Sequence, residues 1–133
     1  MPYTLLRQEI LETEFPAAVA RGMSFVIGAP YQSGILASGS KGASNADYAA
    51  PSPELIKQVE GIEAVCARHG VPLRIAAANF PLGHPAITAL LIGGETPDQF
   101  SETVAALRTP IPAALWADLR AEGLIRADAP VPA

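Results

Sequence analysis

The residues whose types favour ligand binding lie in one loop that follows an apolar run. The run Ser24–Ile27 is aromatic and β-branched, which predicts a strand buried on both faces. Barrels and open α/β sheets bind their ligands at the carboxyl ends of such parallel strands. We therefore expect a ligand site in the loop that follows, which Gly28, Pro30 and Gly34 mark.

Metal binding and thiol chemistry are not expected. The sequence has two histidines and one cysteine. His84 lies between Gly83 and Pro85, where it is expected to fix a turn, and one histidine without acidic or cysteine neighbours makes no zinc site. Cys66 falls on the apolar face of a predicted helix, so we expect it in the core. It has no partner for an internal disulfide, which fits a reducing cytoplasm.

Three apolar segments predict the strands that would hold the loop. Met23–Ile27 and Ile87–Ile92 are expected as full strands, and Tyr3–Leu6 as the end of another. Because strands and helices alternate along the chain, we predict an α/β fold with a parallel sheet. Three strands cannot close a barrel, so the chain resembles a piece of a larger α/β fold.

Helices are expected around these strands. Leu11, Phe15 and Val19 form an apolar stripe that ends at Gly22, and Pro16 either kinks this helix or starts its regular part. A second helix starts at Ser52-Pro53 and ends at Gly70, and residues 72–82 form an alanine-rich helical piece.

The capping box Thr96-Pro97-Asp98-Gln99 starts a helix that is expected to bury Phe100, Val104 and Leu107. A last helix is predicted to end at Gly123. Residues 37–51 are predicted to form a long loop, either functional or a disordered insertion, and residues 128–133 a flexible tail.

Composition excludes several classes of partner. Of 133 residues, 50% are hydrophobic, so the chain can form a core. The net charge is −4 and lysine and arginine do not cluster, which argues against nucleic acid and anionic membranes. No apolar run is long enough to span a bilayer, and the first residues lack the pattern of a signal peptide. We therefore expect a cytoplasmic protein.

Four motifs together resemble the aldo/keto reductase family. They are Tyr-Thr-Leu-Leu-x-Gln at 3–8, Val-Ile-Gly-Ala-Pro-Tyr-Gln-Ser-Gly-Ile-Leu at 26–36, Ile-Glu-Ala-Val-Cys-Ala-Arg-His-Gly-Val-Pro-Leu at 62–73, and Phe-Pro-Leu-Gly-His-Pro-Ala at 80–86. The branch that they resemble most contains bacterial sugar and pyridoxal dehydrogenases.

The resemblance implies the carboxyl-terminal portion of a TIM (β/α)8 barrel, with residues 1–133 forming a partial domain that binds NAD(P). No stretch matches the motifs that carry the family's catalytic Asp, Tyr, Lys and His, so the resemblance implies no catalytic residue here. The chain alone is therefore not expected to catalyse.

The resemblance also implies contacts to the nicotinamide half of the cofactor. Gln8 corresponds to a glutamine that supports the nicotinamide carboxamide, although it also suits a polar helix entry. Gly28, Ala29, Pro30 and Tyr31 correspond to the loop that lines the nicotinamide and the pyrophosphate. Ser33 would offer its hydroxyl to the pyrophosphate or satisfy the turn.

Contacts to the adenosine half are implied after the second full strand, at Gly93, Glu95, Gln99, Glu102 and Thr103. Glycine at 93 would let the backbone approach the cofactor closely. Gln99 has an equally good explanation as the capping partner of Thr96. A carboxylate at Glu95 would repel a 2′-phosphate and accept from a 2′-hydroxyl, so NAD is favoured over NADP.

The substrate implied by the resemblance is a small sugar or an aldehyde such as pyridoxal. Tyr48 in the long loop would stack on it or anchor the loop. Two other hypotheses remain open. In one, the chain is a non-catalytic half-barrel that assembles with itself or with a separate amino-terminal half. In the other, it is a degenerate product that folds poorly alone.

Overall fold

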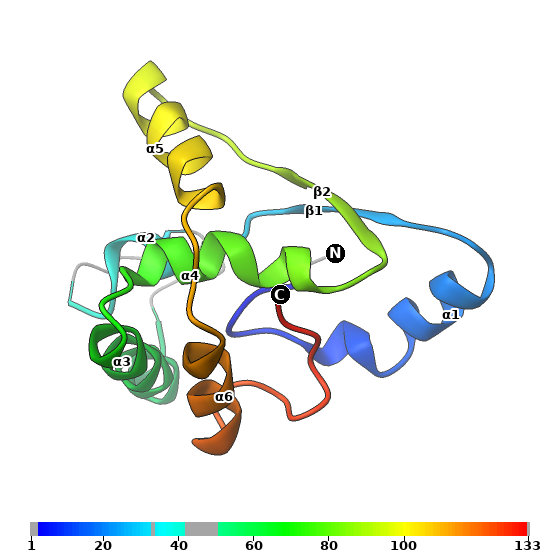
Figure 1. Ribbon diagram of the computed structural model, residues 1–133, viewed down its shortest axis with the longest axis horizontal. Helices are drawn as coiled ribbons and strands as arrows, with labels where there is room; N and C mark the ends of the chain where they lie inside the picture. The colour runs from blue at the N-terminus through cyan, green and yellow to red at the C-terminus, as the bar shows by residue number, and fades with distance from the viewer. Residues whose placement is uncertain (1–2, 33, 42–50, 133) are drawn as a thin grey trace.

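The computed structural model describes residues 3–32, 34–41 and 51–132 (Figure 1). None of the helices in these ranges is long and apolar enough to cross a membrane. The elements in chain order are η1 Glu9–Leu11, α1 Glu14–Ala20, β1 Phe25–Gly28, α2 Ile35–Ser38, α3 Pro53–Arg68, α4 Leu73–Asn79, η2 Phe80–Gly83, β2 Ile87–Leu91, α5 Pro97–Leu107 and α6 Ala113–Ala121.

The strands β1 and β2 pair in parallel, which confirms the predicted α/β fold with a parallel sheet. Gly28 is opposite Leu91 and Ile27 is opposite Leu90. The sheet lies on one side of α4, and α3 and α6 lie on the other, while α5 projects away from the rest (Figure 1). Because the two strands are parallel, their carboxyl ends lie at the same end of the sheet.

The prediction of a strand end at Tyr3–Leu6 is wrong. Thr4 and Arg7 exchange backbone hydrogen bonds of 2.9 and 3.1 Å and close a tight turn. The Thr4 hydroxyl accepts hydrogen bonds from the backbone N–H groups of Leu6 and Arg7. A threonine side chain that binds its own neighbouring backbone in this way competes with strand pairing. The described sheet therefore has two strands and not three.

The apolar runs predicted strands that are buried on both faces, and this prediction is wrong. Ile27 is fully buried, but Val26 is 59% exposed and Leu91 is 69% exposed. Side chains alternate between the two faces of a strand, so Ile27 points to the helices and Val26 to the opposite face. One face of the sheet is thus apolar and uncovered.

The helix boundaries follow the predicted capping residues. The Ser52 hydroxyl accepts from the Leu55 N–H at 3.1 Å and starts α3, and Thr96 does the same for Gln99 at the start of α5. Of the two alternatives for Pro16, the second holds: α1 begins at Glu14, within two residues of it. Three glycines follow their helices in the left-handed conformation that glycine favours: Gly22, Gly70 and Gly123.

The predicted apolar stripe of α5 does not face the core. Phe100 is 55% exposed, and Thr103 and Ala106 are buried instead. The helix meets the rest of the fold mainly through α4. Val104 and Leu107 are half-buried, so the stripe that was expected inside is only partly covered.

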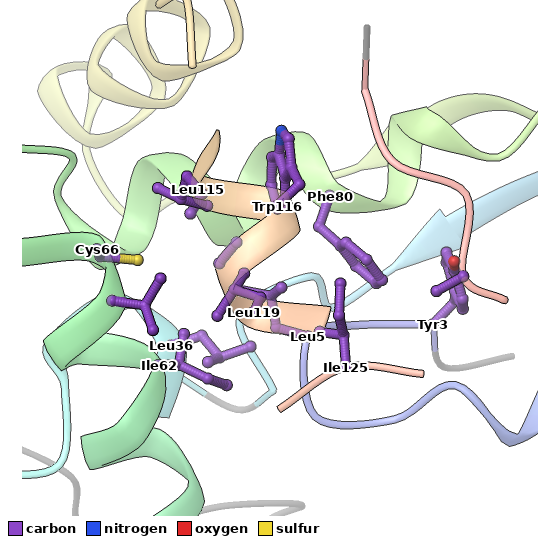
Figure 2. Packing of buried hydrophobic residues seen from close by; sticks show 14 of the residues in the cluster. Tyr3, Leu5, Leu36, Ile62, Cys66, Phe80, Leu115, Trp116, Leu119 and Ile125 are labelled. Carbon is purple, nitrogen blue, oxygen red and sulfur yellow. The ribbon is translucent and has the colours of Figure 1, made fainter. Parts of the chain in front are cut away.

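The core lies between α3, α4, α6 and the amino-terminal turn (Figure 2). Trp116 on α6 packs near Phe80, with ring centroids 6.0 Å apart, and Phe80 stacks on Tyr3 at 5.1 Å. Cys66 is buried on α3, as expected. Burial of these large side chains is the main favourable term holding the two ends of the chain together.

The carboxyl-terminal residues predicted as a flexible tail are packed. Ala129 is fully buried, and Val131 lies against the core. The Arg120 guanidinium donates to the carbonyl of Ala129. The predicted long loop at residues 37–51 begins within α2, which spans Ile35–Ser38, and residues 42–50 lie outside the described residues.

Candidate functional site

The two predicted ligand-binding segments start at the same edge of the sheet. Gly28 ends β1 and is paired with Leu91 at the end of β2. The segment Ala29–Tyr31 and the segment Ile92–Gly94 therefore leave neighbouring strands side by side. Such an edge, where the carboxyl ends of parallel strands meet, is the usual ligand position in α/β proteins.

Gly28 and Gly93 leave open space at this edge. A Cβ atom built on either residue would meet no atom within 4 Å. Neither backbone has a positive φ, so no turn conformation requires glycine at these positions. The absence of two side chains here leaves room for a ligand to approach the backbone.

The loop after β1 has an unusual backbone. Ala29 and Gln32 both have φ of 52°, in the left-handed region that non-glycine residues rarely adopt. Pro30 is buried, and Gln32 is buried with its side-chain Oε1 accepting from the Thr4 hydroxyl at 2.9 Å. Sequence reasoning did not single out Gln32 or Thr4, because nothing in the local pattern indicated that they would meet.

The side-chain amide of Gln8 is hydrogen-bonded within the chain. Its side-chain amide nitrogen donates to the carbonyls of Thr4 and Leu5, at 3.0 and 2.8 Å. Its Oε1 accepts from the backbone N–H of Arg126 at 2.8 Å. Both amide hydrogens are thus used within the chain. Gln8 lines a hollow of about 340 Å³ together with Leu6, Gln58, Leu124 and Arg126.

Glu102, predicted on the adenosine half of the cofactor, pairs with Arg74 on α4. Arg74 Nη1 donates to Glu102 Oε2 at 2.7 Å. The bond to Glu102 raises the pKa of Arg74, and the nearby Tyr31 hydroxyl adds to this. Sequence reasoning missed Arg74, since nothing in its own helix marks it.

The remaining adenosine-side residues serve α5 itself. Gln99 Oε1 accepts from the Glu95 N–H at 2.7 Å, which supports the capping explanation of Gln99. The Thr103 hydroxyl donates to the Gln99 carbonyl at 3.0 Å, and Thr103 is buried. Glu95 and Gly93 are exposed. Two predicted residues, Ser33 and Tyr48, lie outside the described residues.

Three groups that could serve in chemistry, His84, Cys66 and Tyr3, are buried in the described part of the fold. His84 accepts at Nδ1 from the Ala86 N–H at 3.0 Å, so it fixes the turn before β2 as predicted. Burial raises the pKa of the Cys66 thiol to about 11 and also raises the pKa of the Tyr3 hydroxyl. In residues 3–32, 34–41 and 51–132, no cluster of three or more His, Cys, Asp or Glu side chains is arranged to hold a metal ion.

Taken together, this edge of the sheet leaves backbone groups and open space for a ligand, and the described part of it offers no acid–base pair.

No protein-family model matches the chain. Over 124 residues, 92% of its length, it is 41% identical to pyridoxal 4-dehydrogenase of Microbacterium luteolum. It is 34% identical over 124 residues to D-threo-aldose 1-dehydrogenase of a Pseudomonas species. The chain spans only 36% and 38% of the lengths of these two curated relatives.

Proposed function

We propose that this chain is the cofactor-binding carboxyl-terminal portion of an NAD(P)-dependent aldo/keto reductase. Both relatives are enzymes of the aldo/keto reductase family, which confirms the resemblance expected from the motifs. The fold of this chain is then the last part of a TIM (β/α)8 barrel. The observation that carries the proposal is the pairing of Gly28 with Leu91, which brings the segments Ala29–Tyr31 and Ile92–Gly94 to the same edge of the sheet.

In this role the chain's own residues bind and orient the cofactor. The nicotinamide, when bound, would exchange a hydride with the carbonyl carbon of a sugar or a pyridoxal-like substrate. Gly28 and Gly93 would leave room for the dinucleotide backbone. Ala29, Pro30 and Tyr31 would lie on the nicotinamide side. Because the family's catalytic motifs have no match here, the role is cofactor binding and not proton transfer.

For Gln8 the proposed role changes from direct to indirect. Both of its amide hydrogens are bound within the chain, so it would hold the turn at Thr4 and not the carboxamide itself. Thr4 in turn binds Gln32 in the loop after β1. Gln8 would therefore support the nicotinamide side of the site from behind.

The proposed preference for NAD over NADP depends on Glu95. This residue is exposed just after β2, and its backbone N–H is held by Gln99. A carboxylate at the adenosine side would repel a 2′-phosphate. Glu95→Ala is expected to narrow the difference between NADPH and NADH affinity. If the wild type and the variant discriminate equally between the two nucleotides, the proposed role of Glu95 is contradicted.

The main test is nucleotide binding by the purified chain, followed by NADH fluorescence. Gly28→Val and Gly93→Val fill the open space at the strand ends and are expected to weaken binding at least about ten-fold. Ala121→Val, an exposed site at the end of α6, is the matched control. Unchanged binding in both glycine variants would overturn the proposal.

A second function is favoured by the uncovered sheet face. Val26 and Leu91 are exposed, and a two-stranded sheet has two open edges. Such a surface favours association with further strands, so the alternative is a half-barrel that assembles with itself or with a separate amino-terminal half. Light scattering after size exclusion tests it: Val26→Lys should reduce a wild-type oligomer, and Ala121→Lys should not. A monomeric wild-type chain would contradict self-assembly.

A further inference from the structure

Gln32 adopts a backbone conformation that glycine would adopt at lower cost. Its φ of 52° lies in the left-handed region, where the Cβ atom of an L-residue comes too close to the backbone. Two residues further on, where φ is again positive, the chain has Gly34. A strained residue persists only where surrounding contacts hold it, and such residues cluster at functional segments. The side chain of Gln32 is therefore expected to make a contact that offsets this cost.

The side chain of Gln32 meets the turn near the start of the chain. Its Oε1 accepts a hydrogen bond from the Thr4 hydroxyl at 2.9 Å, across 28 residues of sequence. Both residues are buried, Gln32 at 4% exposure and Thr4 at 0%. A hydrogen bond between buried side chains is costly to break, since each group would lose its partner where little water can replace it. The loop after β1 is thus tied to a segment that is distant in the sequence.

Thr4 is itself held in place by its neighbours. Its hydroxyl accepts from the N–H groups of Leu6 and Arg7, at 3.1 and 3.2 Å, and donates to Gln32. A threonine hydroxyl has one donor and two acceptor sites, so all three are used. The Thr4 carbonyl accepts from the Arg7 N–H and from the side-chain amide of Gln8. The hydroxyl therefore has a fixed direction and offers the loop a well-ordered partner.

The backbone of the loop is hydrogen-bonded on both sides of Gln32. The Gln32 N–H donates to the carbonyl of Ala29 at 3.1 Å, and Ala29 has the same φ of 52°. The carbonyl of Tyr31 accepts from the N–H groups of Gly34 and Leu36, at 3.1 and 3.0 Å. Leu36 is fully buried, so the core fixes the far end of the loop. The hydrogen bond from Thr4 then fixes its middle.

We propose that Gln32 is a positioning residue: the Thr4 hydroxyl holds its side chain, and this bond fixes the loop after β1 at the nicotinamide side of the site. The inference rests on the proposed function for the identity of the ligand. The bond and its effect on the loop are properties of the chain without nucleotide. Because a loop that already has its bound conformation costs less entropy to order, the bond should raise the affinity for the cofactor.

Amide hydrogen exchange of the nucleotide-free chain tests whether Gln32 holds the loop. Gln32→Gly removes the side chain and suits the left-handed backbone, so exchange at Gly34 and Leu36 should become about two- to ten-fold faster, the range expected for one lost hydrogen bond. Ala29→Gly is the matched control, since it relaxes the same φ of 52° but removes only an exposed methyl group. It should leave exchange at both amides within about two-fold of the wild type. Equal effects of the two variants would overturn the proposal.

Variants of Thr4 test the same bond from its other side. Thr4→Val keeps the shape but has no hydroxyl, so it should speed exchange at Gly34 and Leu36 by a similar factor, whereas Thr4→Ser should stay near the wild type. In the double variant of Thr4→Val and Gln32→Gly the two effects should not add, because both break one bond. Additive effects would overturn the proposal. So would acceleration at Gly34 and Leu36 that does not exceed the acceleration along α6, since that would reflect a general loss of stability.

NADH binding then separates this inference from the proposed function. If Gln32 positions the loop for the cofactor, Gln32→Gly and Thr4→Val should each raise the NADH dissociation constant about two- to ten-fold, and Thr4→Ser should not. Faster exchange of the loop with an unchanged dissociation constant would overturn the role in positioning. If the variants loosen the loop but the wild-type chain binds no NADH, the proposed function is contradicted and the hold of Thr4 on the loop is established.

Discussion

The side-chain Oε1 of Gln8 accepts a hydrogen bond from the backbone N–H of Arg126 at 2.8 Å, across 118 residues of sequence. The same amide donates to the carbonyls of Thr4 and Leu5. One buried side chain thus satisfies three backbone groups and joins the two ends of the chain. A buried backbone group left without a partner is destabilising, so this amide is important for the fold.

Gln8→Leu should therefore lower the free energy of unfolding by about 1–3 kcal/mol, because the Leu5 carbonyl and the Arg126 N–H lose their partner and the Thr4 carbonyl keeps only the Arg7 N–H. Urea unfolding followed by circular dichroism measures this. Gln58→Leu makes the same change on the half-buried face of α3 and should cost much less. Equal losses in the two variants would show that the connection to Arg126 contributes little.

Gly83 should not tolerate a side chain. A Cβ there would lie 2.5 Å from the carbonyl carbon of Val131 and 2.6 Å from the nitrogen of Pro132. Gly83→Ala is expected to displace residues 129–132, lowering stability by about 1–3 kcal/mol and exposing the terminus to carboxypeptidase. Gly94→Ala is the control, since its nearest atoms are at an ordinary 3.7 Å. Resistance to the protease in both variants would argue against this packing.

His84 should make the protein less stable in acid. Burial lowers the pKa of His84, and its Nδ1 already accepts from the Ala86 N–H. The unfolded chain therefore binds a proton more readily than the folded one below about pH 6.5, and the free energy of unfolding falls as the pH drops through that value. The neighbouring rings are Tyr3 and Phe15, and Asp128 lines the same hollow.

Urea unfolding between pH 8 and pH 5 checks this prediction. His84→Asn keeps an acceptor near the Ala86 N–H but cannot titrate, so its stability should depend less on pH than that of the wild type. Parallel curves for the two proteins would assign the acid response to other groups.

Ala29 should be more stable as glycine. Its φ of 52° is costly for an L-residue, and it is exposed, so no packing is lost. Ala29→Gly is expected to raise the free energy of unfolding by about 0.5–1 kcal/mol. Ala17→Gly, in the middle of the exposed face of α1, should instead lower it by about 1 kcal/mol. Thermal unfolding of the pair measures the difference, and a loss of stability in both would mean that Ala29 is not held in this conformation.

The local features of the fold were predictable from the sequence. The helix starts at Ser52 and Thr96 and the glycines after α1, α3 and α6 were expected, because a cap depends on groups within a few residues. The two strands and their parallel direction were also predicted. Two errors arose where an apolar run or stripe was used to infer burial, at Val26 and Phe100, since exposure depends on what covers a face. A third arose at Tyr3–Leu6, where a turn closed by Thr4 replaces the expected strand end.

The sequence by itself determined the elements, their caps, the parallel sheet and the family resemblance, because each is encoded by short-range patterns or by motifs. Only the tertiary structure decided which side chains meet. Gln8 with Arg126, Gln32 with Thr4, and Arg74 with Glu102 each join residues at least 28 positions apart. A polar side chain has many possible partners, and packing of the core brings one of them within hydrogen-bonding distance.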